Sequence, residues 1–161
     1  MKVVVADTGA LISLVYVSQI DLIEKVLGDF FIADAVWNEL VVYENPEFDK
    51  NILKYLQKRV VKIKSRNYLS MILDYGESES VILYEELNAD FLLIDDNKAR
   101  TIAESLDVNC IGSIGLLIRA KQKGLITELK PIFEKWILIG RYFSKKLLNK
   151  ILIDLGESAM M

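Results

Sequence analysis

The chain has 161 residues, of which 52% are hydrophobic and 27% charged, and 20 basic against 23 acidic side chains give a net charge of −3. Such a length and apolar content suit one packed domain. They exclude disordered and collagen-like chains, which contain fewer apolar residues or far more Gly and Pro. The acidic balance gives no support to a broadly basic, phosphate-binding surface.

The chain has no histidine and a single cysteine, Cys110. Catalytic triads and zinc sites built on paired histidines are excluded, because each needs an imidazole. A lone cysteine cannot form an internal disulfide, which is typical of a reducing cytoplasm. No secretory leader and no membrane-spanning apolar stretch is visible, so we expect a cytoplasmic protein without a membrane partner.

Short apolar runs alternate with amphipathic stretches along the chain. The pattern predicts strands at 3–6, 30–33, 60–63, 91–94 and 108–111. It predicts helices at 10–27, from 34 or 35 to 41, at 48–57, after Gly76 to 87, and at 98–106, 113–123, 129–139 and 144–155. This alternation predicts a single α/β domain with a mainly parallel sheet covered by helices on both faces.

Acidic residues follow two of the predicted strands directly. Asp7 comes after the first strand, and Asp95 and Asp96 come after the strand at 91–94. Because the carboxyl ends of parallel strands meet at one edge of a sheet, we expect these acids to share a site. Glu39 and Glu77 lie near helix starts that can face the same edge.

Several carboxylates in one cleft repel one another unless a cation neutralises them. Mg²⁺ and Mn²⁺ are the natural candidates, because both are hard ions that prefer oxygen ligands. Each acid also has a simpler interpretation on its own. Asp7 could cap the helix that follows it, Glu77 could favour a helix N-terminus, and Glu39 could be a surface residue.

Two enzyme classes share part of the opening pattern. Asp7, Thr8 and Gly9 match the Asp-Thr-Gly loop of aspartic proteases, but those enzymes are built from strands and this tripeptide leads into a helical pattern. Phosphatases of the haloacid-dehalogenase type also place Asp after the first strand. They carry a second Asp two residues later, where this chain has Gly9.

Four longer segments occur in the order VVADTGALISL, LDYGESESVILYEELNADFLLIDDNKAR, IGSIGLLIRAKQKGLI and FSKKLLNKILIDLGE. Together they resemble the PIN-domain proteins, specifically the DUF3368 subgroup, which is similar to VapC-type toxin ribonucleases. The resemblance covers nearly the whole chain, and we take residues 1–161 as one PIN-like domain. It implies a three-layer α/β/α fold and an acidic cleft that binds Mg²⁺ or Mn²⁺ and cleaves single-stranded RNA.

By this resemblance, the family's catalytic acids correspond to Asp7, Glu39, Glu77, Asp95 and Asp96. Four of them, all except Glu39, are predicted to hold the metal ion. A metal ion held there would lower the pKa of a bound water for an in-line attack on the phosphate. At the third position Glu stands where classical PIN nucleases more often have Asp.

Further residues are predicted to contact the substrate. The resemblance places Thr8 beside the first acid and Ser113 where the family often has Thr, and Lys98 and Arg100 follow Asp96 closely enough to touch phosphate. A second basic stretch could guide RNA or be a solvated helix face; its members are Lys50, Lys54, Lys58, Arg59, Lys62, Lys64 and Arg66. Among the aromatic residues, Trp136, Tyr142 and Phe143 are candidates for base stacking.

The C-terminal helices, from about residue 127, are rich in apolar residues. They are expected to pack on the domain or on a partner, so a homodimer is predicted. In toxin-like relatives, the partner of the cleft would be an antitoxin protein. The alternative function is a PIN-like module that is catalytically weak or inactive and binds nucleic acid or protein.

Overall fold

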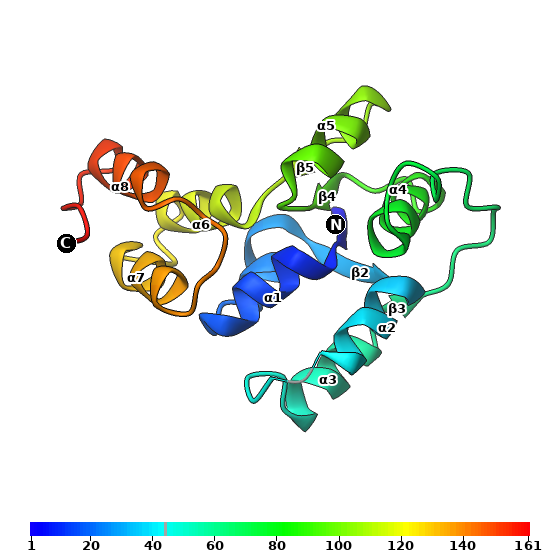
Figure 1. Ribbon diagram of the computed structural model, residues 1–161, viewed down its shortest axis with the longest axis horizontal. Helices are drawn as coiled ribbons and strands as arrows, with labels where there is room; N and C mark the ends of the chain where they lie inside the picture. Colours follow the sequence, from blue (N-terminus) through cyan, green and yellow to red (C-terminus); the bar gives the residue numbers. More distant parts are fainter. Residues whose placement is uncertain (44) are drawn as a thin grey trace.

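A five-stranded parallel sheet is the centre of the computed structural model, which describes residues 1–43 and 45–161 (Figure 1). The strands are β1 (Val3–Ala6), β2 (Asp29–Ala33), β3 (Val60–Val61), β4 (Phe91–Leu93) and β5 (Cys110–Ile111). All neighbouring pairs run parallel, in the order β3-β2-β1-β4-β5. Helices lie on both sides of this sheet, so the predicted three-layer α/β/α fold is confirmed.

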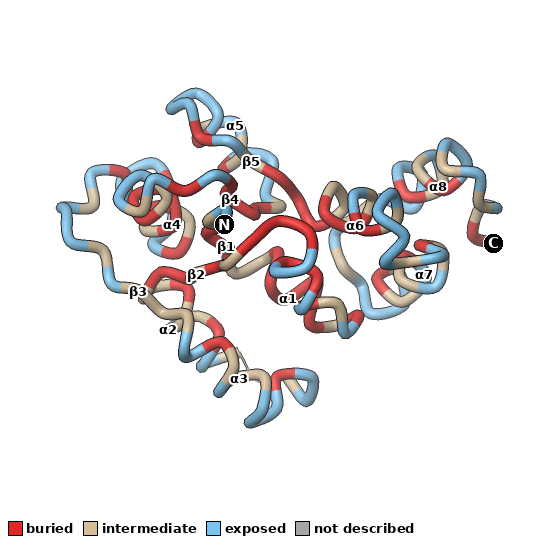
Figure 2. The backbone as a smooth tube through the Cα atoms, turned by 180° about the vertical axis from the view of Figure 1, so that it is seen from behind, coloured by how far each residue is buried: buried red, intermediate tan, exposed pale blue. Residues whose placement is uncertain are grey.

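The middle strand β1 is buried on both faces. Val4 pairs with Phe30 of β2 on one side and with Phe91 of β4 on the other. Continuous runs of β-branched and aromatic residues are typical of strands in parallel sheets, where helices cover both faces. Figure 2 shows the buried residues concentrated along these strands and α1.

The strand order reverses at β1. The chain passes from β1 to β2 and β3 on one side, and then returns to the other side of β1 to form β4 and β5. In open α/β sheets, a crevice forms beyond the carboxyl ends of the strands where the order reverses. Asp7 follows β1 and Asp95 follows β4, so both acids lie at this crevice.

The helical elements follow the predicted alternation with the strands. They are α1 (Thr8–Tyr16), η1 (Ile23–Leu27), α2 (Asp34–Val42), α3 (Lys50–Gln57), α4 (Tyr75–Glu86), α5 (Asn97–Ser105), α6 (Ser113–Gln122), α7 (Lys130–Leu138) and α8 (Lys145–Asp154). Within the described part of the chain, none of these helices is long and apolar enough to cross a membrane.

The predicted helix at 10–27 is wrong in its middle. α1 ends at Tyr16, the backbone turns through Ser18 with a φ of 56°, and the short π-helix η1 follows. A continuous helix would turn Leu22 to the face opposite Ile20, because side chains two residues apart differ by about 200° around a helix. The turn allows the side chains of Val17, Ile20 and Leu22 to be buried.

The C-terminal segment packs on α1 of its own chain. The indole of Trp136 on α7 is fully buried and donates to the carbonyl oxygen of Ser13 at 2.8 Å. Arg141 extends this contact by donating to the Ser13 hydroxyl and to the carbonyl oxygen of Gly9, both at 3.1 Å. Burial gives Trp136 a core role in place of the predicted base stacking.

Candidate active site

Asp7 is the most deeply buried acid of the crevice, with 6% of its surface exposed. It occupies the N-cap position of α1, yet its side chain makes no capping hydrogen bond. Its Oδ1 instead accepts a long hydrogen bond of 3.4 Å from the buried Ser80 hydroxyl. Burial is the main reason that the pKa of Asp7 is raised well above its ordinary value, and the charges of Glu77 and Glu39 add to it.

Glu39 reaches the crevice from α2. Its Oε2 accepts a hydrogen bond of 2.5 Å from the Thr8 hydroxyl. The carboxylate lies against Gly76, where an added Cβ would be 2.4 Å from Glu39 Oε1. Gly76 is therefore needed for this close approach, and partial burial raises the pKa of Glu39.

Glu77 lies in the first turn of α4, where Asp74 is the N-cap residue. Asp74 accepts from the Glu77 amide at 2.8 Å, and its own amide donates to Glu77 Oε1 at 3.4 Å. This reciprocal pair is a capping box. Burial, followed by the nearby charge of Asp74, raises the pKa of Glu77 to about 7.

Asp95 and Asp96 are adjacent in the chain but make different contacts. Asp95 accepts from the amide and the hydroxyl of Ser113, both at 2.7 Å, and from the Tyr142 hydroxyl at 3.2 Å. Asp96 is exposed and caps α5 by accepting from the Ala99 amide at 2.8 Å. Asp95 is thus held at three points, while Asp96 has a carboxylate oxygen free of the cap.

These residues enclose one cavity of about 560 Å³, which we call the acidic cleft. It is lined by Asp7, Thr8, Gly9, Glu39, Asp74, Glu77, Asp95, Asp96, Asn97, Lys98 and Tyr142. The structure therefore brings together all five predicted acids with Thr8 and Lys98. Ser113 lies buried behind Asp95, and Arg100 lines a neighbouring pocket.

Three residues that contact the cleft acids were absent from the predicted acidic site: Asp74, Ser80 and Tyr142. Asp74 carries a sequence signal, because Asp followed three residues later by Glu is a capping-box pattern. Ser80 and Tyr142 have no comparable signal as partners of the acids. Each reaches its carboxylate from a distant part of the chain, 73 residues from Asp7 for Ser80 and 47 residues from Asp95 for Tyr142.

The acidic cleft fits a hard divalent cation by its donor chemistry. Its lining contains six carboxylates and one ammonium group, that of Lys98. Burial is the main reason that the pKa values of Asp7, Glu39 and Glu77 are raised, and the charges of neighbouring carboxylates raise each of them further. Within residues 1–43 and 45–161, no three acidic side chains already form a ligand cluster, so binding would require side chains to reorient.

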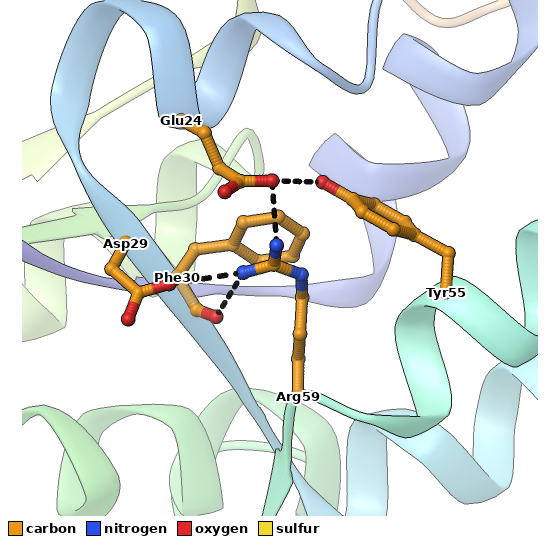
Figure 3. A network of polar contacts seen from close by, with 5 residues as sticks. All are labelled: Glu24, Asp29, Phe30, Tyr55 and Arg59. Atoms are coloured by element: carbon orange, nitrogen blue, oxygen red, sulfur yellow. Dashed lines mark hydrogen bonds and ion pairs between the residues drawn. The ribbon is translucent and has the colours of Figure 1, made fainter.

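Arg59 is part of the predicted basic stretch, but its side chain makes structural contacts within the domain. Figure 3 shows its guanidinium donating to Glu24, Asp29 and the carbonyl oxygen of Phe30, and only 14% of the side chain is exposed. It precedes β3, and Asp29 begins β2, so this network lies at the sheet edge opposite the acidic cleft. The lysines of α3 remain exposed, as a solvated helix face predicts.

A parallel α/β/α sheet with acids gathered at its reversal point fits the nuclease-type fold of a PIN domain. The family model described as PIN domain, DUF3368, matches residues 3–157. The chain therefore belongs to the DUF3368 family of PIN domains, and the predicted resemblance is confirmed. PIN domains are generally nucleases and usually use divalent metal ions. No curated protein matches the chain significantly.

Proposed function

We propose that this PIN domain is an endoribonuclease that cleaves single-stranded RNA in the acidic cleft with the help of Mg²⁺ or Mn²⁺. One observation carries the proposal. Six carboxylates meet one lysine at the reversal point of the sheet, and the pKa values of three of them are raised. Such an arrangement costs stability unless a cation and a phosphate complete it.

Asp7, Glu77, Asp95 and Asp96 would hold the metal ion, and Glu39 would complete the catalytic acids. The bound ion would supply the charge that activates water and neutralises the phosphate. Asn97 and Lys98 follow the acid pair at the start of α5, and the Lys98 ammonium would attract the RNA backbone.

Hydroxyl groups around the cleft orient these acids. Ser113 and Tyr142 hold Asp95, Ser80 contacts Asp7, and Thr8 bonds to Glu39. Thr8 would act on substrate through Glu39 as well as by direct contact, and Ser113 would act through Asp95. These hydrogen bonds limit the movement of the acids, and the side chains would still have to come closer together when a metal ion binds.

RNA cleavage by purified protein tests the proposal. Wild-type protein with Mn²⁺ should cleave a labelled single-stranded RNA internally, and chelation of the metal should stop the reaction. Asp7→Asn should lower the rate at least a hundredfold. Asp21→Asn is a matched control, because Asp21 is exposed and pairs with Lys25 outside the cleft. Full cleavage by Asp7→Asn would contradict the proposal.

The proposal extends to partners and location. We infer a cytoplasmic, toxin-like component whose cleft is blocked by an antitoxin protein, and a homodimer formed through the C-terminal helices. Exposed apolar side chains support protein contacts at both places: Val42 and Tyr75 lie beside the cleft, and Leu138 and Ile153 lie on α7 and α8. Light scattering of the purified chain tests the dimer, and a monomer would contradict it.

A catalytically inactive module is the second candidate. It is favoured by the lack of a ready-made ligand cluster among the described residues and by the engagement of Glu77 in a capping box. Such a module would bind RNA without cleaving it and would bind no Mn²⁺ in the cleft. The same cleavage assay, combined with metal titration, separates the two functions.

A further inference from the structure

A second pocket adjoins the acidic cleft on the side of α5, α6 and α8. It has a volume of about 590 Å³ and shares three residues with the lining of the cleft: Asp95, Asn97 and Tyr142. A volume in this range is typical of small-ligand sites. We call this cavity the apolar pocket.

The walls of the apolar pocket are mainly hydrophobic. Ile111 and Ile118 come from β5 and α6, Phe143 precedes α8, and Leu147 and Ile151 lie on α8. Leu147 is 46% exposed, so part of this apolar wall is accessible to a ligand. These surfaces suit the flat face of an aromatic ring.

One end of the apolar pocket carries the Arg100 guanidinium together with the Asp95 carboxylate. Arg100 lies beside Gly112, where an added Cβ would be 3.1 Å from both Arg100 Nη1 and Asp95 Oδ1. Within the described residues, the ion pair of Arg100 is a long one, 3.9 Å from Nε to Glu104 Oε1. The guanidinium is therefore available to an anion next to the acidic cleft.

We propose that the apolar pocket binds one nucleotide of the RNA substrate, adjacent to the phosphate that is cleaved. The base would pack against the apolar walls, and Arg100 would bind the phosphate. This inference rests on the proposed function. An RNA nucleotide is favoured over an apolar peptide, because the pocket continues into the cleft and combines apolar walls with a cation at the shared end.

Adenosine monophosphate, observed by amide NMR of the full chain in the presence of a chelator, tests the inference. The chelator prevents phosphate from binding through a metal in the cleft. AMP should shift the amide signals of Gly112, Gly115 and Leu147 in a saturable way. Adenosine should bind more weakly, and inorganic phosphate should leave Leu147 unshifted.

Variants separate the pocket from the cleft. Arg100→Gln should weaken AMP binding about tenfold, because a hydrogen bond to a charged group is lost. Leu147→Asp should abolish the shifts. Controls are Lys150→Gln, which also removes one charge, and Ile72→Asp, which introduces the same charge at a side chain with 55% exposure outside the pocket.

The outcomes distinguish this inference from the proposed function. AMP shifts that persist in Asp7→Asn would show that the pocket binds independently of the cleft. If the protein binds AMP in this way but cleaves no RNA, the pocket is supported and the proposed function is not. The inference is overturned if AMP shifts none of the pocket amides, or if Arg100→Gln and Leu147→Asp bind AMP like wild type. It is also overturned if these amides broaden with rising protein concentration and AMP causes no further shift, which would show that a second copy fills the pocket.

Discussion

Ser113 binds both carboxylate oxygens of Asp95: its amide donates to Oδ1 and its hydroxyl to Oδ2, each at 2.7 Å. Ser113 begins α6 and is fully buried, so this contact joins the start of that helix to the end of β4. The orientation of one cleft acid therefore depends on packing at the β5–α6 junction. A hydroxyl at position 113 acts on the site through Asp95.

Ser113→Ala tests this dependence. The variant keeps the amide hydrogen bond and loses the hydroxyl, which should cost about 1–2 kcal/mol of unfolding free energy in urea titrations. Mn²⁺ affinity should fall several-fold, because Asp95 loses one of the three hydrogen bonds that orient it. Ser113→Thr, which keeps a hydroxyl at this position, should restore both properties. Wild-type metal affinity in Ser113→Ala would contradict the positioning role.

Gly76→Ala tests the approach of α2 to α4. The new methyl group would overlap Glu39, whose carboxylate must then move and lose its hydrogen bond to Thr8. Because the clash falls on the end of a flexible side chain, we expect a loss of about 1 kcal/mol, near the cost of the lost hydrogen bond, and at least tenfold slower RNA cleavage. The double variant Gly76→Ala, Glu39→Ala should recover stability relative to the single variant, as a double-mutant cycle would show. Strictly additive effects would argue against the clash.

The metal-free protein should become less stable as pH rises. Burial raises the pKa values of Asp7 and Glu39, and that of Glu77 from an ordinary 4.5 to about 7. A carboxyl with a higher pKa in the folded state keeps its proton longer there, so deprotonation favours unfolding. The stability should fall between about pH 4.5 and pH 7.

Melting curves in a chelator measure this effect, and a loss of 1 kcal/mol lowers Tm by about 2–4 °C for a chain of this size. Asp7→Asn should flatten the pH profile, because it removes the most buried carboxylate. Added Mn²⁺ should restore Tm at pH 7 more than at pH 4.5. A chelated wild-type protein whose Tm rises from pH 4.5 to pH 7 would contradict the assignment.

Arg59→Lys should destabilise the fold without altering catalysis. The guanidinium pairs with Glu24 and Asp29 and lies 4.1 Å from the centre of the Phe30 ring. Lysine cannot reproduce this forked and stacked geometry, so we expect a loss of about 2–3 kcal/mol. KM for RNA should stay unchanged in Arg59→Lys and in the control Lys58→Gln, which alters an exposed side chain. If Arg59→Lys raised KM and Lys58→Gln did not, Arg59 would be assigned a role in RNA binding.

The strands and most helices could be predicted because their patterns are local. The acids after β1 and β4 were found for the same reason, since parallel strands bring their carboxyl ends to one edge. The break after Tyr16 and the contacts of Tyr142 were not predictable, because both depend on packing against distant segments. Arg59 was misassigned since its sequence neighbours are lysines, whereas its partners lie some 30 residues away.

The central claim is that the acids of the crevice form a metal site, and Mn²⁺ titration by calorimetry tests it most directly. Wild-type protein should show a saturable binding event at pH 7. The variant that combines Asp95→Asn with Asp96→Asn should lose that event while keeping a cooperative melting transition. Equal Mn²⁺ binding by both proteins, or no binding by wild type, would contradict the account.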